Sequence, residues 1–328
     1  MPSISPVKWD PPPRAPFEGR FAANDRLAAV ELWPTPAEGP EDVAVDSRGF
    51  LYTGTVDGSI LRFSPGGGDP ELLFNTGGRP LGVEIDAEDR IVICDAHRGL
   101  LRWSGDSPEL LVNSYEGEEF KFTNNAAVAS DGTIYFTVSS RRFGIGDYKL
   151  DLIEHSGTGR LYALRSGGQL ELLVDGLHFS NGVALSEDES FLVYAETGMY
   201  SMSKLWLTGV RRGQVETLIE NLPGFPDNLT QRDGIFWVAL AGPRDKIVDI
   251  LARSPILARL TAMLPDSLQP APTRYAAVFG IDENGTVIHN LQDPDGRYAV
   301  TTAALAHGDH LYLGSLHDSA VARLALPV

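Results

Sequence analysis

Four short polar segments of this 328-residue chain each stand directly before an apolar run, and each carries a carboxylate or amide side chain. One such segment alone is typical of a turn, but four at matching positions indicate a shared site. Carboxylate and amide oxygens suit a hard cation, calcium above all, which takes about six to eight oxygen ligands. No cluster of thiolates or imidazoles accompanies them, so zinc and copper are disfavoured. The segments are Gly39-Pro40-Glu41-Asp42, Phe122-Thr123-Asn124-Asn125, Phe179-Ser180-Asn181-Gly182 and Pro226-Asp227-Asn228.

Other candidate nucleophiles and bases are few. The chain has no Gly-x-Ser-x-Gly sequence for a serine hydrolase and no glycine-rich phosphate-binding fingerprint. The single cysteine, Cys94, lies in an apolar stretch without a basic neighbour, which indicates a buried thiol and excludes an internal disulfide. Of seven histidines, His178 stands three residues before Asn181 and is placed to face the predicted site. It is either a proton shuttle or substrate contact, or a wall histidine bonded to the backbone.

A repeating fold must bring these segments together, and the chain has such a repeat. A turn with Asp or Gly followed by a hydrophobic strand recurs, and equivalent positions are separated by 40, 43, 58, 44 and 75 residues. Repeats of about 40 to 45 residues with several strands are typical of propeller blades. Six repeats predict an all-β, six-bladed β-propeller whose inner strands carry the polar segments to one end of a central channel. The equivalent positions are Leu51, Ile91, Ile134, Leu192, Phe236 and Leu311.

The two longest intervals require insertions. Residues 141–157 form a polar loop within the third blade, and residues 244–264 lie within the fifth. Only the second insertion has a helical period, so helix is expected mainly at about 244–264. Two short amphipathic helices are predicted there, on either side of Pro255, and they either pack on the propeller or cover its mouth. Their apolar stripes are Ile247, Ile250 and Leu251, then Ile256, Leu257, Leu260 and Leu264.

The ends of the chain complete the predicted ring. Residues 27–33 can add the outer strand to the last blade, at residues 320–326, which leaves no open edge strand. Residues 1–24 then form a proline-rich arm, and residues 25–328 form one propeller domain with its helical insertion at about 244–264.

The charge balance limits the partners. Lys and Arg number 27 against 44 Asp and Glu, which gives a formal net charge of −17. An acidic surface repels phosphate backbones and anionic lipids, so neither nucleic acid nor a membrane is expected as a partner. No apolar run reaches the length of a membrane span, and the N-terminal residues lack a signal core, so a cytoplasmic protein is expected. The oligomeric state is not predicted.

Together these segments resemble the strictosidine synthase-like family, within the wider group of six-bladed propellers that includes gluconolactonase and paraoxonase. The resemblance extends over roughly residues 25–328 and rests on an ordered set of motifs. They are residues 39–42, 131–140, 179–185, 226–228 and 311–315.

The resemblance implies one catalytic calcium at the channel mouth. Its ligands would be Glu41, Asn124, Asn181 and Asp227, with Asn228 as a fifth. Two departures from the family pattern matter. A second, structural calcium is in doubt, because the position that is often Asp in relatives is Asn125 here. The acidic residue on which strictosidine synthase depends aligns with Thr302, which argues against an amine–aldehyde condensation.

The favoured hypothesis is a calcium-dependent hydrolase that acts on a small-molecule lactone or ester. The cation would polarise the carbonyl, and Asp227 or Glu41 would act as base or nucleophile, with His178 as a further catalytic candidate. One alternative is a synthase-like condensing enzyme, which Thr302 disfavours. The other is a non-enzymatic propeller that binds a small molecule or a protein.

Overall fold

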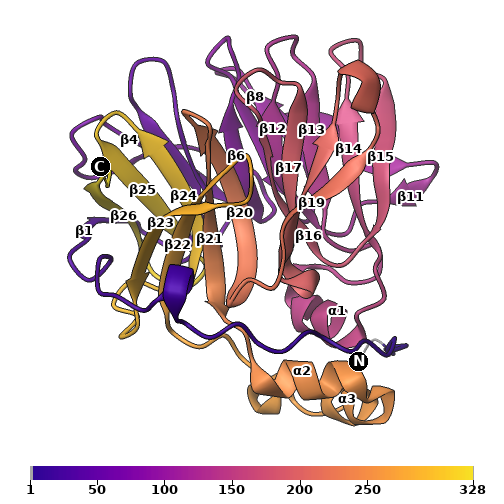
Figure 1. Cartoon of the computed structure of the whole chain (residues 1–328). Helices are drawn as coiled ribbons and strands as arrows, with labels where there is room; N and C mark the ends of the chain where they lie inside the picture. The colour runs from indigo at the N-terminus through magenta and orange to yellow at the C-terminus, as the bar shows by residue number, and fades with distance from the viewer. Residues whose placement is uncertain (1–2, 328) are drawn as a thin grey trace.

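Within residues 3–327, which the computed structural model describes, the strands form six four-stranded antiparallel sheets around a common axis (Figure 1). This arrangement confirms the predicted six-bladed β-propeller. The first three blades are β2 (Val43–Val45), β3 (Leu51–Gly54), β4 (Ser59–Phe63) and β5 (Glu71–Asn75); β6 (Pro80–Ile85), β7 (Ile91–Asp95), β8 (Gly99–Trp103) and β9 (Glu109–Val112); and β12 (Thr123–Val128), β13 (Ile134–Val138), β14 (Gly159–Leu164) and β15 (Leu170–Leu177).

The last three blades follow the same order, except that the final one takes a strand from the N-terminal part of the chain. They are β16 (Ser180–Leu185), β17 (Phe191–Glu196), β18 (Ser201–Trp206) and β19 (Val215–Ile219); β20 (Gly224–Arg232), β21 (Ile235–Pro243), β22 (Ala276–Asp282) and β23 (Val287–Asp293); and β24 (Thr301–His307), β25 (His310–Ser315), β26 (Ala320–Ala325) and β1 (Glu31–Pro34). A short hairpin, β10 (Ser114–Tyr115) and β11 (Glu118–Glu119), lies outside the blades.

The recurring aspartates close the turns between the first two strands of a blade. In two blades, an oxygen of Asp46 or Asp86 accepts a hydrogen bond from the backbone N–H four residues later, at 2.9 Å, and Asp282 accepts the same bond at 2.8 Å in the turn between the third and fourth strands of the fifth blade. The second strands are mostly buried, and all five residues of β7 are. The local repeat of turn and apolar strand therefore produces the blades, as the sequence indicates.

The ring closes as predicted. Strand β1 pairs with β26 in antiparallel register, with Trp33 opposite Val321. The Trp33 ring is buried and contacts the rings of Phe63 and Tyr312, with centroids 5.6 Å apart in both pairs. The N-terminal part of the chain thus holds the first and last blades together, since Phe63 lies in the first blade and Tyr312 in the last.

Helices gather at one end of the propeller (Figure 1). Helices α2 (Lys246–Arg253) and α3 (Pro255–Ala262) occupy the insertion of the fifth blade, as predicted, and η5 (Asp266–Leu268) follows them. The expectation of a plain polar loop at 141–157 was wrong, because this insertion contains η2 (Ile145–Asp147) and α1 (Tyr148–Glu154). The buried side chains of Leu150 and Ile153 give α1 an apolar face, which packs against α2 and α3.

The N-terminal arm runs between α1 and the α2–α3 pair (Figure 1). The Val7 N–H donates to the carbonyl of Glu154 at 2.9 Å, and the Trp9 N–H donates to the carbonyl of Ala252 at 2.8 Å. Farther along, η1 (Gly19–Phe21) packs against the fifth blade through Phe21. The arm therefore bridges the two insertions. The remaining short helices are η3 (Thr197–Met199) and η4 (Gly209–Arg211).

Candidate active site and metal centre

Three of the predicted ligands lie in irregular starts of inner strands. The strand register shifts between Thr123 and Ala126 in β12, between Ser180 and Val183 in β16, and between Pro226 and Leu229 in β20. Such bulges redirect the side chains of the extra residues. Here those residues are the predicted ligands of blades three to five, while Glu41 lies just before β2. Four of the five predicted ligands line one pocket: Glu41, Asn124, Asn181 and Asp227.

Small residues let the inner strands approach one another at these positions. A Cβ atom on Gly182 would lie 2.3 Å from the backbone nitrogen of Leu229, and one on Gly314 would lie 2.4 Å from the carbonyl oxygen of Glu41. Real Cβ atoms do not come this close, so any larger side chain would push the strands apart. The Asn181-Gly182 pair thus serves close packing in a strand, not a turn.

Hydroxyl groups from one blade fix the backbone of the next blade's ligands. Thr137 donates to the carbonyl of Asn181 at 2.7 Å, and Thr197 donates to the carbonyl of Pro226, also at 2.7 Å. Thr302 donates to the carbonyl of Glu41 at 2.6 Å. This positioning role of the threonine hydroxyls was not predicted from the sequence, because the role depends on which blades are neighbours.

The site amides bond their side-chain nitrogens to neighbouring hydroxyl groups. The side-chain N–H groups of Asn124 and Asn181 donate to the hydroxyls of Ser139 and Thr197, at 2.9 and 3.1 Å. Their Oδ1 atoms, together with one oxygen each of Asp227 and Asn228, are buried and have no hydrogen-bond partner. Buried acceptors without a partner are costly, and each requires an explanation. Four of them at one site are the donor set that a cation would satisfy.

The two carboxylates of the site are buried, with Glu41 3% and Asp227 7% exposed. Burial raises the pKa of Glu41 to about 7, against the opposing effect of the Arg79 charge. Burial also raises the pKa of Asp227 well above its usual value, and the negative charge of Glu41 adds to this effect. A bound cation would offset the cost of burying this pair of carboxylates.

Asn228 lies behind the pocket wall rather than in it. Its side chain is fully buried, and its N–H donates to Oε2 of Glu41 at 3.1 Å. It is not among the residues that line the pocket, although its own side-chain oxygen has no partner. This geometry supports two roles for Asn228, orienting Glu41 and contributing a fifth oxygen.

The residues suggested for a second calcium site are instead hydrogen-bonded to other groups of the protein. The carboxylate of Asp42 accepts hydrogen bonds from the N–H groups of Val43 and Val83 and from the side chain of Asn125, at 2.9–3.1 Å. The oxygen of Asn125 in turn accepts the N–H of Val183 at 2.9 Å. Asn125 therefore supplies a donor where a carboxylate would have needed a cation.

The structure does not bring His178 to this pocket. Its ring stacks on that of His155 with centroids 4.1 Å apart, and His155 stacks on Trp9 of the N-terminal arm at 4.3 Å. The backbone N–H of His178 donates to Glu196 at 2.9 Å. His178 thus connects the propeller to the arm, and nothing in its placement supports a catalytic role.

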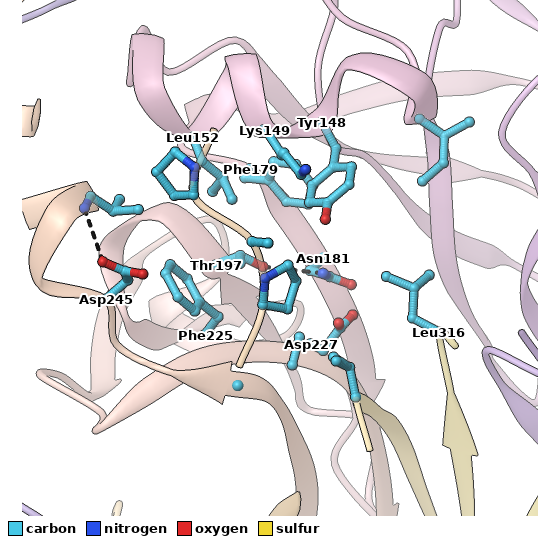
Figure 2. A pocket seen from close by; sticks show the side chains of 18 of the residues that line it. Tyr148, Lys149, Leu152, Phe179, Asn181, Thr197, Phe225, Asp227, Asp245 and Leu316 are labelled. Carbon is cyan, nitrogen blue, oxygen red and sulfur yellow. Dashed lines mark hydrogen bonds between the residues drawn. The ribbon is translucent and has the colours of Figure 1, made fainter. Parts of the chain in front are cut away.

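Apolar side chains surround the polar base of the pocket. Figure 2 shows Asn181 and Asp227 pointing toward each other, with Phe179, Phe225 and Leu152 around them. Phe179 takes the left-handed backbone conformation with φ of 58°, which is uncommon for a bulky residue and typical of functional sites. The pocket has about 970 Å³ of empty space, part of it open to solvent.

Both insertions contribute to the walls above this base. Tyr148, Lys149 and Leu152 come from α1 (Figure 2). Val248 comes from α2. The sequence analysis anticipated α2 at the mouth as one of two options but missed α1. Helix α1 was not predicted because its segment is polar and has too few apolar positions to show a helical period.

The described residues hold no group of three or more His, Cys, Asp and Glu side chains that would bind a metal without help from amides. The candidate centre therefore depends on two carboxylates and amide oxygens, a donor set that favours calcium over transition metals. No helix within the described part of the chain is both long and apolar enough to cross a membrane.

Comparison with protein families gives two matches. A model described as strictosidine synthase matches residues 124–210, and one described as strictosidine synthase-like, N-terminal, matches residues 19–63. Protein STRICTOSIDINE SYNTHASE-LIKE 6 of Arabidopsis thaliana is 35% identical over 317 residues, which cover 94% of this chain and 83% of that protein. Adipocyte plasma membrane-associated protein of Rattus norvegicus is 31% identical over 335 residues, covering 94% of this chain and 89% of that protein.

Solved structures share the fold at lower sequence identity. A gluconolactonase from Xanthomonas campestris has a TM-score of 0.67 and 20% identity, and the match covers 100% of this chain and 98% of that one. A calcium-binding regucalcin from Agrobacterium tumefaciens has a TM-score of 0.62 and 14% identity, covering 89% and 90% of the two chains. These similarities establish the propeller fold.

Proposed function

The chain belongs to the strictosidine synthase-like family, and from this premise we propose that it is a calcium-dependent hydrolase of lactones or esters. One observation carries the proposal. Three amide oxygens and one oxygen of Asp227 are buried without partners, and they lie beside the buried carboxylate of Glu41 at the base of an apolar pocket. The fold shared with a gluconolactonase and with a calcium-binding regucalcin supports the same reading.

Glu41, Asn124, Asn181 and Asp227 would hold the cation, with Asn228 behind Glu41. When bound, calcium would supply the positive charge that polarises a carbonyl group and stabilises the oxyanion formed from it. Asp227, the more exposed of the two ligand carboxylates, or Glu41 would take a proton from water or attack the carbonyl carbon. The apolar walls would exclude bulk water and receive the hydrocarbon part of the substrate.

The placement of Thr302 favours hydrolysis over condensation. Its hydroxyl is buried and donates to the backbone of Glu41, so it positions a ligand and is not available as an acid or base. The pocket lining includes no histidine, and its third carboxylate, Asp245, caps α2, which leaves Glu41 and Asp227 as the candidate bases at the base of the pocket.

The test combines metal content, activity and a matched variant. The protein purified without chelator is expected to contain calcium and to hydrolyse a lactone or an aryl ester in a reaction that EDTA abolishes. Asp227→Asn at saturating calcium should lose about a hundredfold to ten-thousandfold in rate. Asp282→Asn, in a turn of the same blade, should leave the rate unchanged.

Calcium binding also has a readout that does not depend on activity. Added calcium should raise the thermal midpoint of the wild type, because a ligand that binds only the folded state stabilises it. The rise should be smaller for Asp227→Asn, since ligand charge sets calcium affinity. Hydrolysis at the wild-type rate by the calcium-saturated variant would refute the role of Asp227. If the wild type showed no EDTA-sensitive hydrolysis, a binding propeller would be the better reading.

A further inference from the structure

The helical insertion of the fifth blade presents an apolar face to solvent. Sixteen large apolar side chains are exposed among the described residues, and eight of them lie in this one segment. Their exposed fractions range from 39% for Leu264 to 71% for Met263. We call these eight residues the lid face: Ile247, Ile250, Ile256, Leu257, Leu260, Met263, Leu264 and Leu268.

The lid face is not needed to hold the helices on the protein. Leu251 and Ala258 pack inward against Ile153 of α1, together with Ile4 of the N-terminal arm. The side chains of Asp245 and Ser254 cap the N-termini of α2 and α3. The helices are therefore capped and anchored on one side and apolar on the other, and contiguous exposed apolar surface marks an interaction site.

Helices α2 and α3 carry more cationic than acidic side chains, unlike the whole molecule. Asp249, the only acidic residue within α2 and α3, is buried and bonded to Arg244 at 3.0 Å. Lys246, Arg253 and Arg259 are exposed on the same two helices, and Arg253 pairs with Asp10. Although the chain carries −17, the exposed charged side chains within α2 and α3 are all cationic, and the acidic residues Asp245 and Asp266 lie just outside these helices.

We propose that the lid face docks α2 and α3 in the interfacial plane of an anionic lipid surface. Short helices with apolar side chains and flanking cations bind lipid interfaces in this way. A standard protein interface takes about 20–30 residues from each side, more than this face offers, and two copies meeting here would bring like charges together. The net charge predicts repulsion from lipid, but docking depends on the local face.

Docking through the lid face would bring the pocket close to the lipid surface. Val248 of α2 lines the pocket, and so do Pro270 and Pro272, just after the lid face. A ligand dissolved in the lipid would therefore meet the pocket at the docked end of the molecule. The docking proposal itself does not depend on the hydrolase activity.

The experiment measures sedimentation of the full chain with vesicles. We expect binding to vesicles made from equal parts of phosphatidylcholine and phosphatidylserine, weaker binding to pure phosphatidylcholine, and further weakening at high salt. Leu260→Ser should lower the partition coefficient about tenfold, and Ile256→Ser with Leu260→Ser should lower it further. Leu72→Ser is the matched control, because Leu72 and Leu260 are both 58% exposed, and it should bind as the wild type does.

Removal of charge tests the electrostatic part separately. Lys246→Gln and Arg259→Gln should each weaken binding to the anionic vesicles about fivefold and leave binding to phosphatidylcholine nearly unchanged. The proposal is overturned if the wild type fails to sediment with either vesicle, or if Leu260→Ser binds as well as Leu72→Ser. It is also overturned if analytical ultracentrifugation shows a dimer that Leu260→Ser converts to a monomer, since a second copy would then cover the face.

Discussion

At the scale of single residues, the site is defined by oxygens that the protein leaves unpaired. Each site amide commits its nitrogen to a hydroxyl or a carboxylate, which leaves its oxygen for the pocket. An unpaired buried acceptor costs about 1–3 kcal/mol. The Ser and Thr hydroxyls of neighbouring blades stabilise this arrangement by holding the ligand backbones in place.

Thr302→Val tests whether these hydroxyls position the ligands. The change keeps the shape of the side chain and removes the bond to the Glu41 carbonyl, so unfolding free energy should fall by about 1 kcal/mol. Calcium affinity, measured by calorimetry, should fall as well. Thr53→Val is the matched control, because Thr53 donates to the carbonyl of Asp42, also at 2.6 Å. It should lose similar stability without losing calcium affinity, and equal effects on affinity would contradict the positioning role.

At the scale of elements, the strands carry the polar ligands and the helices line the pocket. Bulged strand starts hold the polar base, and the helices of two insertions form part of the pocket wall. The walls come from separate blades and are joined by the N-terminal arm. Substrate size is therefore expected to depend on the helices and metal binding on the strands.

Val248→Phe should narrow the mouth, because Val248 of α2 lines the pocket. Relative rates on a small lactone and a bulky aryl ester, measured side by side, should shift toward the lactone by about tenfold. Such a shift is the usual effect of a small change in a pocket wall. An unchanged ratio, or calcium affinity that falls in parallel, would show that α2 does not act as a wall for the substrate.

The contact between the arm and α1 should make stability depend on pH. His155 ends α1, and its burial, with a smaller effect from His178, lowers its pKa to about 3. The unfolded chain has a histidine pKa of about 6.5, so between these values the unfolded state binds more protons and stability falls as the pH falls.

We expect His155→Phe, which keeps an aromatic ring against Trp9, to remove this dependence. Urea unfolding at about pH 7 and about pH 5.5 should show the wild type losing roughly 1 kcal/mol more than the variant. Equal losses in both proteins would mean that His155 does not stay neutral in the folded state.

At the scale of the whole molecule, the propeller depends on closure between its two chain ends. Strand β1 completes the last blade and packs its one buried side chain, Trp33, between the first and last blades. The ring that holds the four ligands together is closed here, at a distance in sequence from all but Glu41.

Trp33→Ala should therefore lower the free energy of unfolding by about 3–5 kcal/mol. Leu32→Ala is its control on the same strand, because Leu32 is 51% exposed and its loss should change stability by about 0.5 kcal/mol or less. Urea denaturation measures both. A small effect of Trp33→Ala would mean that the blades hold together without this closure.

The sequence by itself determined the repeat and the types of the site residues. Turn aspartates, alternating strands and short polar segments are local patterns, and their periodic recurrence is enough to predict six blades and an oxygen-rich channel mouth. The bulges that carry Asn124, Asn181 and Asp227 were not predicted and appear only in the strand pairing of the structure. The apolar positions of α2 and α3 were also visible, because helical periodicity is local.

Only the tertiary structure determined which side chains find a hydrogen-bond or stacking partner. Asn125 pairs with Asp42, Thr302 holds the backbone of Glu41, and His178 stacks on His155, all through contacts between residues far apart in sequence. It also decided that α1 joins the pocket and that most of the apolar stripes of α2 and α3 face outward, while Leu251 packs inward. A periodic pattern shows that a helix has an apolar face, but only the packing of the other segments determines whether that face meets protein or solvent.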